Sequence, residues 1–447
     1  MDAVVLTADE AETLQSRIAG ALLRDGVAVG DRVAFVPDDP GLDARRLCFV
    51  VGALRVGIIP VVLNALLTER ERTELLADAQ AVRVLDDAAL ASLSSGPHAD
   101  LAPVPLGRPM LYTSGTTGVP KGVWTGVLNE ADALALQREE NEQWGFVADD
   151  VHLVCGNVHH SAPLRFATGT LLAGGTVVLP GKFDALTQLR ALEQFAPTSS
   201  FMAPVHLHRL LDLTEDDASL YKRFRLLCHA GAPTSDAVKR RAIATFPADT
   251  VWEFYGATEC QFTACASDEW LARPGTVGRA RAGRTIAVDD HGVIWCTPPR
   301  HARFAYWNDP AKTAAAWDGD AFTVGDLGRL DDAGYLFLDG RRDDLILSGG
   351  VNVYPAEIER VMLAVDGVDV AAVFPRDDDE WGQRVCAAYV GDASPATVTA
   401  AVRENLAGYK NPKELHHVAE IPHSPNGKIR RSVLAKELGL DDHPRLL

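Results

Sequence analysis

The sequence has no closely spaced pair of cysteines. Its seven cysteines are scattered over 447 residues, and none forms a CxxC pattern. An odd, dispersed set opposes both a disulfide framework and a zinc site built on cysteine. We therefore expect reduced thiols, most of them buried.

Positive charge is also in short supply. Lysine and arginine together number 43 against 61 aspartates and glutamates, which gives a net charge of −18. This balance opposes nonspecific binding to nucleic acid or to an anionic membrane. A polyanionic substrate would have to bind in a local pocket that is rich in basic groups or backbone amides.

Long uninterrupted apolar runs are missing. The opening residues, MDAVVLTADEAE, contain no basic stretch followed by an apolar core, so no secretory signal is predicted. The most apolar long stretch, residues 47–67, is interrupted by Arg55 and Pro60, and it predicts a buried helix leading into a strand. We expect a cytoplasmic protein with no membrane partner.

The chain is longer than one hydrophobic core usually serves, so we expect at least two domains. Helical and strand patterns alternate through the first three quarters, which predicts an α/β fold with largely parallel strands. The helices are expected at residues 10–25, 45–56, 69–77 and 185–195. The strands are expected at residues 32–36, 58–64, 151–155, 176–179, 200–202 and 226–230.

The texture of the sequence changes toward the C-terminus. Residues 283–338 show short apolar runs separated by turn residues, which is typical of antiparallel β structure. We predict a large N-terminal domain over residues 1–339, made of α/β layers and a β subdomain. A small α+β domain over residues 340–447 is predicted to follow, with helices at 355–365 and 398–406 and strands at 369–375 and 384–390.

One loop stands out chemically. Residues 113–122 read TSGTTGVPKG, so hydroxyls and backbone amides can surround a polyanion while Lys121 adds a positive charge. This is not the Walker pattern, because Pro120 stands where that motif, counted from Gly115, needs its second glycine. A flexible surface turn is the alternative interpretation.

Five further motifs follow this loop in a fixed order, at residues 255–259, 323–326, 340–344, 348–355 and 425–428. Together with the loop they resemble the superfamily of acyl-CoA synthetases, firefly luciferase and peptide-synthetase adenylation domains, and they are most similar to acid-CoA ligases. The resemblance implies a large N-terminal domain with a small mobile C-terminal domain. It also implies ATP, Mg²⁺ and CoA as cofactors or co-substrates.

The resemblance assigns the phosphate-binding and metal-binding roles. It implies that Lys121 grips the β- and γ-phosphates together with Thr113, Ser114, Gly115, Thr116, Thr117 and Gly118. It also implies that Thr258 contacts phosphate and that Glu259 holds Mg²⁺, for which a carboxylate supplies the hard oxygen that this ion prefers. Taken alone, Glu259 would be read as a solvated surface residue.

The same resemblance places the nucleoside and the acid. Tyr255 is expected to lie against adenine, with Gly256 allowing close approach and with Gly231, Ala232 and Ala257 beside the base and the acyl group. Asp326 and Arg341 are expected to bind ribose, although a surface ion pair would also explain them. His160 resembles a gate beside the acyl pocket and His159 is expected to face away, with a structural histidine as the alternative for either.

The C-terminal motifs imply movement. Lys428 is expected to bridge the acid and the α-phosphate, where a fixed ammonium stabilises charge that builds in the transition state. Asp343 resembles a hinge about which the C-terminal domain turns. Ser348, Gly349 and Gly350 would then leave room for a pantetheine arm.

The sequence therefore predicts that an acid and ATP form acyl-AMP, which CoA converts to a thioester. The predicted partners are a small-molecule acid, ATP, and either CoA or a carrier protein. Two alternatives stay open at this point. One is an adenylate-forming enzyme with a different acceptor or acid: a carrier-protein thiol, an amine, or nitrite for diazotisation. The other is a nucleotide-binding module without turnover.

Overall fold

Eight strands form the largest sheet of the protein, in the order β1 (Val4–Thr7), β8 (Thr176–Leu179), β7 (Val151–Val154), β9 (Ser199–Met202), β10 (Leu226–His229), β11 (Val251–Glu253), β12 (Thr263–Ala266) and β13 (Arg279–Ala280). This computed structural model describes residues 3–67, 69–113, 121–232, 234–341, 346–348, 351–378, 382–406, 408–423, 429 and 431–440. The five strands from β8 to β11 run parallel. The edge strands β1, β12 and β13 pair antiparallel.

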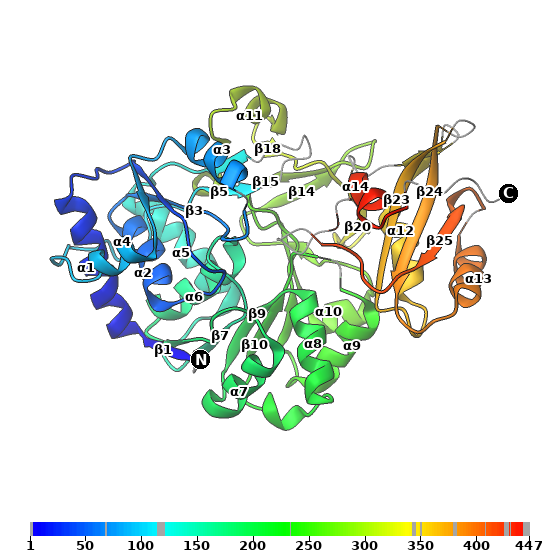
Figure 1. Cartoon of the computed structure of the whole chain (residues 1–447), viewed down its shortest axis with the longest axis horizontal. Coiled ribbons are helices and arrows are strands. Elements are labelled where there is room, and N and C mark those ends of the chain that lie inside the picture. The colour runs from blue at the N-terminus through cyan, green and yellow to red at the C-terminus, as the bar shows by residue number, and fades with distance from the viewer. Residues whose placement is uncertain are drawn as a thin grey trace.

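Helices cover both faces of this sheet (Figure 1). Parallel neighbours need crossover connections, and these are made by α6 (Ser161–Leu172), α7 (Ala185–Phe195), α8 (Pro204–Thr214) and α9 (Asp236–Thr245). Side chains alternate between the two faces: Leu227 belongs to the core under α7, α8 and α9, whereas Leu226 and Cys228 belong to the core with α6. The remaining helices of this region are α5 (Glu130–Trp144), α10 (Ser267–Ala272) and the 3₁₀ helix η1 (Ala218–Leu220).

A second, smaller parallel sheet lies near the N-terminus, with the order β3 (Ile59–Val62), β2 (Arg32–Phe35), β4 (Arg83–Leu85). It shares one core with the helices α1 (Ala8–Arg24), α2 (Ala44–Arg55) and α4 (Asp87–Leu93), and α3 (Glu69–Ala79) follows β3. The predicted α/β class with largely parallel strands is confirmed.

Antiparallel structure links these layers to the C-terminal region. A three-stranded sheet joins β16 (Ala305–Tyr306), β6 (Lys121–Trp124) and β5 (Leu111–Thr113), and a four-stranded sheet joins β14 (Thr285–Val288), β15 (Ile294–Thr297), β18 (Ala321–Phe322) and β17 (Trp317–Asp318). The strands β19 (Asp326–Leu330) and β20 (Leu336–Arg341) form a further antiparallel pair. Along the chain, the 3₁₀ helix η2 (Arg300–Ala302) lies between β15 and β16, and α11 (Pro310–Ala316) lies between β16 and β17. The antiparallel texture expected for residues 283–338 is thus present.

The C-terminal region builds its own sheet, which lies away from α1 and α2 in Figure 1. Its strands are β22 (Val351–Val353), β21 (Ile346–Ser348), β24 (Gly382–Val390), β23 (Val370–Asp378) and β25 (Glu414–His417), and its helices are α12 (Pro355–Leu363), α13 (Pro395–Asn405), α14 (Arg431–Glu437) and the 3₁₀ helix η4 (Gly408–Lys410). Alternate residues of β23 belong to separate cores, one with α12 and α13 and one with α14. The predicted boundary after residue 339 falls inside β20 and stays a prediction.

Local signals explain where helix ends differ from the prediction. Helix α7 has the predicted bounds, but α1 begins at Ala8 because Thr7 and Glu10 form a capping box. Helix α13 begins at Pro395 rather than 398 because Ser394 caps it and proline suits the first turn. All seven cysteines are buried and unpaired, as expected. Within the described part of the chain, no helix combines the length and apolarity needed to cross a membrane.

Candidate active site

Tyr255 and Asp326 meet in the structure although 71 residues separate them. The Tyr255 hydroxyl donates to Asp326 Oδ2 at 2.6 Å, and both side chains are buried. Tyr255 follows β11, while Asp326 opens β19. The Tyr255 ring also stacks on Phe262, with centroids 4.8 Å apart. The predicted adenine residue and the predicted ribose carboxylate therefore lie side by side.

A tight turn holds the rest of this motif. The Ala257 amide donates to the Cys260 carbonyl at 2.8 Å, and Gly256 pairs with Gln261. A Cβ on residue 256 would stand 2.8 Å from the Cys260 carbonyl oxygen, which is closer than real contacts allow. Gly256 is thus required by the turn itself, in addition to any approach of a ligand.

Glu259 is a buried carboxylate, 5% exposed, with one neutral donor. Its Oε1 accepts a hydrogen bond from the Tyr306 hydroxyl of β16 at 2.8 Å, and no other hydrogen bond to its side chain occurs among the described residues. Burial, followed by the charge of Glu259, raises the pKa of Tyr306, so this phenol stays a donor. A buried carboxylate with a single neutral donor is incompletely compensated, and its free oxygen suits a hard cation such as Mg²⁺.

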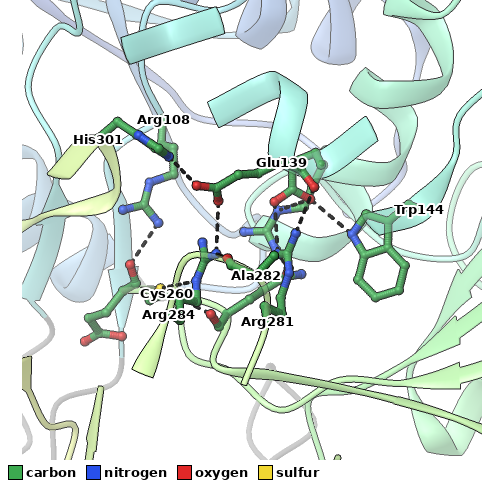
Figure 2. Close-up of polar contacts among 12 residues, drawn as sticks. Arg108, Glu139, Trp144, Cys260, Arg281, Ala282, Arg284 and His301 are labelled. Atoms are coloured by element: carbon green, nitrogen blue, oxygen red, sulfur yellow. Dashed lines mark hydrogen bonds and ion pairs between the residues drawn. The ribbon is translucent and has the colours of Figure 1, made fainter. Parts of the chain in front are cut away.

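Arg108 binds the backbone of this motif, and this role was not predicted from the sequence. Its Nη1 donates to the Glu259 carbonyl at 2.8 Å and to the Thr258 carbonyl at 3.4 Å. In Figure 2 a dashed line runs from the Arg108 guanidinium and ends beside Cys260, the residue after Glu259. Arg108 lies in a loop before β5 and belongs to no recognisable motif. Its position therefore comes from the structure alone.

Lys121 opens β6 opposite Thr113 of β5. Its Nζ lies 3.2 Å from Asp309 Oδ2, and both side chains are about one-fifth exposed. Asp309 also caps α11 by accepting from the Lys312 amide at 2.9 Å. Ser114, Gly115, Thr116, Thr117 and Gly118 lie outside the described residues, as does the side chain of Thr113.

The remaining loop residues follow neighbouring parallel strands. Gly231 and Ala232 come directly after β10, as Tyr255 comes after β11, and ligands of open α/β sheets bind at such carboxyl ends. Gly231 has φ +97°, and a Cβ there would meet nothing within 4 Å. Among the described residues, therefore, only the positive φ disfavours a side chain at position 231.

His160, the predicted gate, contacts its neighbour His159. His160 precedes α6, and its ring centroid lies 4.2 Å from that of His159. His159 is held neutral, because burial and then the neighbouring His160 lower its pKa to about 3. Its Nδ1 is buried without a hydrogen-bond partner among the described residues. The assignment of His160 as the gate stays a prediction.

The C-terminal motifs are described only in part. Arg341 pairs with Asp326 across β19 and β20, so the two expected ribose residues are neighbours in backbone register, although the Arg341 side chain is not described. Ser348 is buried at the end of β21. Asp343, Gly349, Gly350 and Lys428 lie outside the described residues.

Comparison with known proteins identifies the family. A family model described as AMP-binding enzyme matches residues 109–295, and one described as AMP-binding enzyme C-terminal domain matches residues 357–428. A 2-succinylbenzoate-CoA ligase of Bacillus pumilus is 31% identical, covering 97% of this chain and 93% of its own. The long-chain-fatty-acid-CoA ligase FadD13 of Mycobacterium tuberculosis is 29% identical with the same two coverages.

A solved structure supports the same assignment. The crystal structure of ATP-bound MatB from Rhodopseudomonas palustris superposes with a TM-score of 0.83 at 28% identity, over 97% of this chain and 93% of that one. The similarity in sequence and the similarity in fold therefore both extend over nearly the whole chain and indicate the same family. This protein belongs to the AMP-binding enzymes, the adenylate-forming superfamily that its motifs resemble.

Proposed function

We propose that this protein is an AMP-forming ligase that joins a carboxylic acid to the thiol of CoA. The relatives named as CoA ligases and the ATP-bound neighbour support this, because each aligns with more than nine-tenths of the chain. The observation that carries the proposal is the hydrogen bond between Tyr255 and Asp326. It brings together the side chains that we expect to bind the adenine and the ribose of one nucleotide.

In the first half-reaction a carboxylate oxygen of the acid attacks the α-phosphorus of ATP. A new oxygen-phosphorus bond forms as the bond to pyrophosphate breaks, and the products are acyl-AMP and pyrophosphate. Lys121 and residues 113–118 would hold the leaving phosphates, and Glu259 would hold Mg²⁺, which shields their charge when bound. Lys428 would stabilise the charge that builds at the α-phosphate.

In the second half-reaction the CoA sulfur attacks the acyl carbonyl carbon. The bond to the AMP oxygen breaks and the thiol proton is released, which leaves the thioester and AMP. The C-terminal domain would turn about Asp343 between the two steps. Ser348, Gly349 and Gly350 would then make room for the pantetheine arm.

The lysine tests the first half-reaction. We expect Lys428→Ala to lose acid-dependent exchange of labelled pyrophosphate into ATP, while it still converts presynthesised acyl-AMP and CoA to the thioester. Lys436→Ala is the matched control, because Lys436 is an exposed lysine of α14 in the same C-terminal region. Exchange at the wild-type rate in Lys428→Ala would refute the assigned role.

The acceptor is tested by its product. We expect mass spectrometry to find acyl-CoA only when ATP, acid and CoA are all present. If ATP is consumed and a stable organic product forms without CoA, the acceptor is a carrier thiol, an amine or another nucleophile instead.

A further inference from the structure

A cavity of about 110 Å³ lies beside Thr258 and Arg108, where Arg108 binds the carbonyls of the 255–259 motif. Its apolar wall includes Leu54, Leu136 and Leu164. An engineered protein cavity of roughly 150 Å³ accepts benzene. A cavity of this size therefore suits a short acyl group better than a long fatty chain.

The charged side chains that line this cavity are the carboxylate of Glu140 and four arginines: Arg108, Arg165, Arg281 and Arg284. They come from three separate segments, since Arg108 precedes β5, Arg165 lies on α6, and the other two follow β13. Figure 2 shows several of them gathered around the carboxylates of α5. We call these four residues the arginine cluster.

The arginine cluster is short of negative charge. Only two carboxylates pair with it in the described part of the chain: Glu140 Oε1 lies 3.1 Å from Arg281, and Glu139 Oε2 lies 3.0 Å from Arg284. Glu139 also contacts His301 at 2.5 Å. The four guanidinium groups therefore have two carboxylates as ion-pair partners. Cations taken out of water without partners cost free energy that a bound anion would offset.

Three members of the arginine cluster are already committed to the protein. Arg108 bonds to the carbonyls of Thr258, Glu259 and Ala302. Arg281 donates to Glu140 and Gln261, and Arg284 donates to the Ala282 carbonyl and pairs with Glu139. These three arginines therefore already bind groups of the protein itself.

Arg165 differs from the other three. Among the described residues it donates no hydrogen bond, and its one ion-pair contact joins its Nε to Glu140 Oε2 at 3.6 Å. Its side chain is 15% exposed and lines the cavity. Burial lowers the pKa of Arg165, an effect opposed by Glu140 and reinforced by Arg108 and Arg284. Within the described part of the chain its two Nη groups make no hydrogen bond, so they can bind a planar anion.

We propose that the acid activated here carries a second carboxylate and that Arg165 binds it. The inference rests on the proposed function, because it names the class of acid that the proposed ligase would activate. A guanidinium binds a carboxylate through two parallel hydrogen bonds. The second carboxylate of a diacid would compensate the charge of Arg165, whose contact with Glu140 is long at 3.6 Å, and a fatty acid has no such group. The substrate class is thus a short dicarboxylic acid.

Matched pairs of acids test this proposal. We would measure pyrophosphate release with succinate and butanoate, glutarate and pentanoate, and phthalate and benzoate. In the wild-type enzyme we expect kcat/KM to favour the diacid in at least one pair by about 10- to 100-fold, as expected for a hydrogen-bonded charge. Arg165→Met should abolish this preference, and Arg165→Lys should retain part of it. Arg138→Met, at an exposed position of α5, should leave it unchanged.

The ratio of the two kcat/KM values in each pair is measured on one protein preparation. A smaller fraction of folded enzyme lowers both values equally and leaves their ratio unchanged. A wild-type preference for the monoacid in every pair would overturn the inference while leaving the proposed function intact. An equal loss for both members of a pair in Arg165→Met would also overturn it. No pyrophosphate release with any acid would instead refute the proposed function.

Discussion

Removing one hydroxyl from Tyr255 is expected to weaken both the fold and ATP binding. Tyr255→Phe keeps the ring that stacks on Phe262 but deletes the 2.6 Å hydrogen bond to Asp326. Hydrogen bonds to charged groups contribute about 1.5–3 kcal/mol, and the loss falls in this range because the Asp326 carboxylate is left buried without that donor. The dissociation constant for ATP should rise about tenfold, which corresponds to 1.4 kcal/mol.

Tyr335→Phe is the matched control for this experiment. The Tyr335 hydroxyl donates to Glu269 at 3.0 Å, and this carboxylate is 19% exposed and also paired with Arg279. Its loss should cost less than about 1 kcal/mol and leave ATP binding unchanged. Urea unfolding and calorimetric titration with ATP would measure both quantities. If the two variants behave alike in both assays, the assignment of Tyr255 and Asp326 to a nucleotide site is refuted.

Two further substitutions probe the same motif. Tyr306→Phe removes the donor that orients Glu259, so half-saturation of pyrophosphate release by Mg²⁺ should need about tenfold more of the ion; unchanged dependence would remove Glu259 from the metal site. Gly256→Ala pushes a methyl group against the Cys260 carbonyl and should cost about 1–3 kcal/mol in thermal unfolding. Gly408→Ala, with open space around it, should be neutral, and equal melting of both variants would contradict the steric argument.

The sequence predicted the fold where the signals were local. Residues 185–195 carry a clear helical period between strands, and the helix has these bounds. The starts of α1 and α13 were misplaced although Thr7 with Glu10, and Ser394 before Pro395, are signals that the sequence contains. In both helices the cap residues, and not the apolar period, fix the first residue of the helix.

The candidate site was predictable only where residues belong to motifs. Residues 255–259 and Asp326 are recognisable in the sequence, but their contact depends on the pairing of strands far apart in the chain. Arg108 and Arg165 are single arginines in segments without a pattern. Their burial beside one cavity is set by tertiary packing, which no local spacing encodes.

Acid-dependent exchange of labelled pyrophosphate into ATP by the wild-type enzyme tests the central claim most directly. Formation of acyl-AMP is reversible, so exchange should require the acid and Mg²⁺ but not CoA. The net reaction with CoA should release AMP and pyrophosphate in equal amounts. Production of ADP and inorganic phosphate, or exchange that does not depend on any acid, would contradict this account.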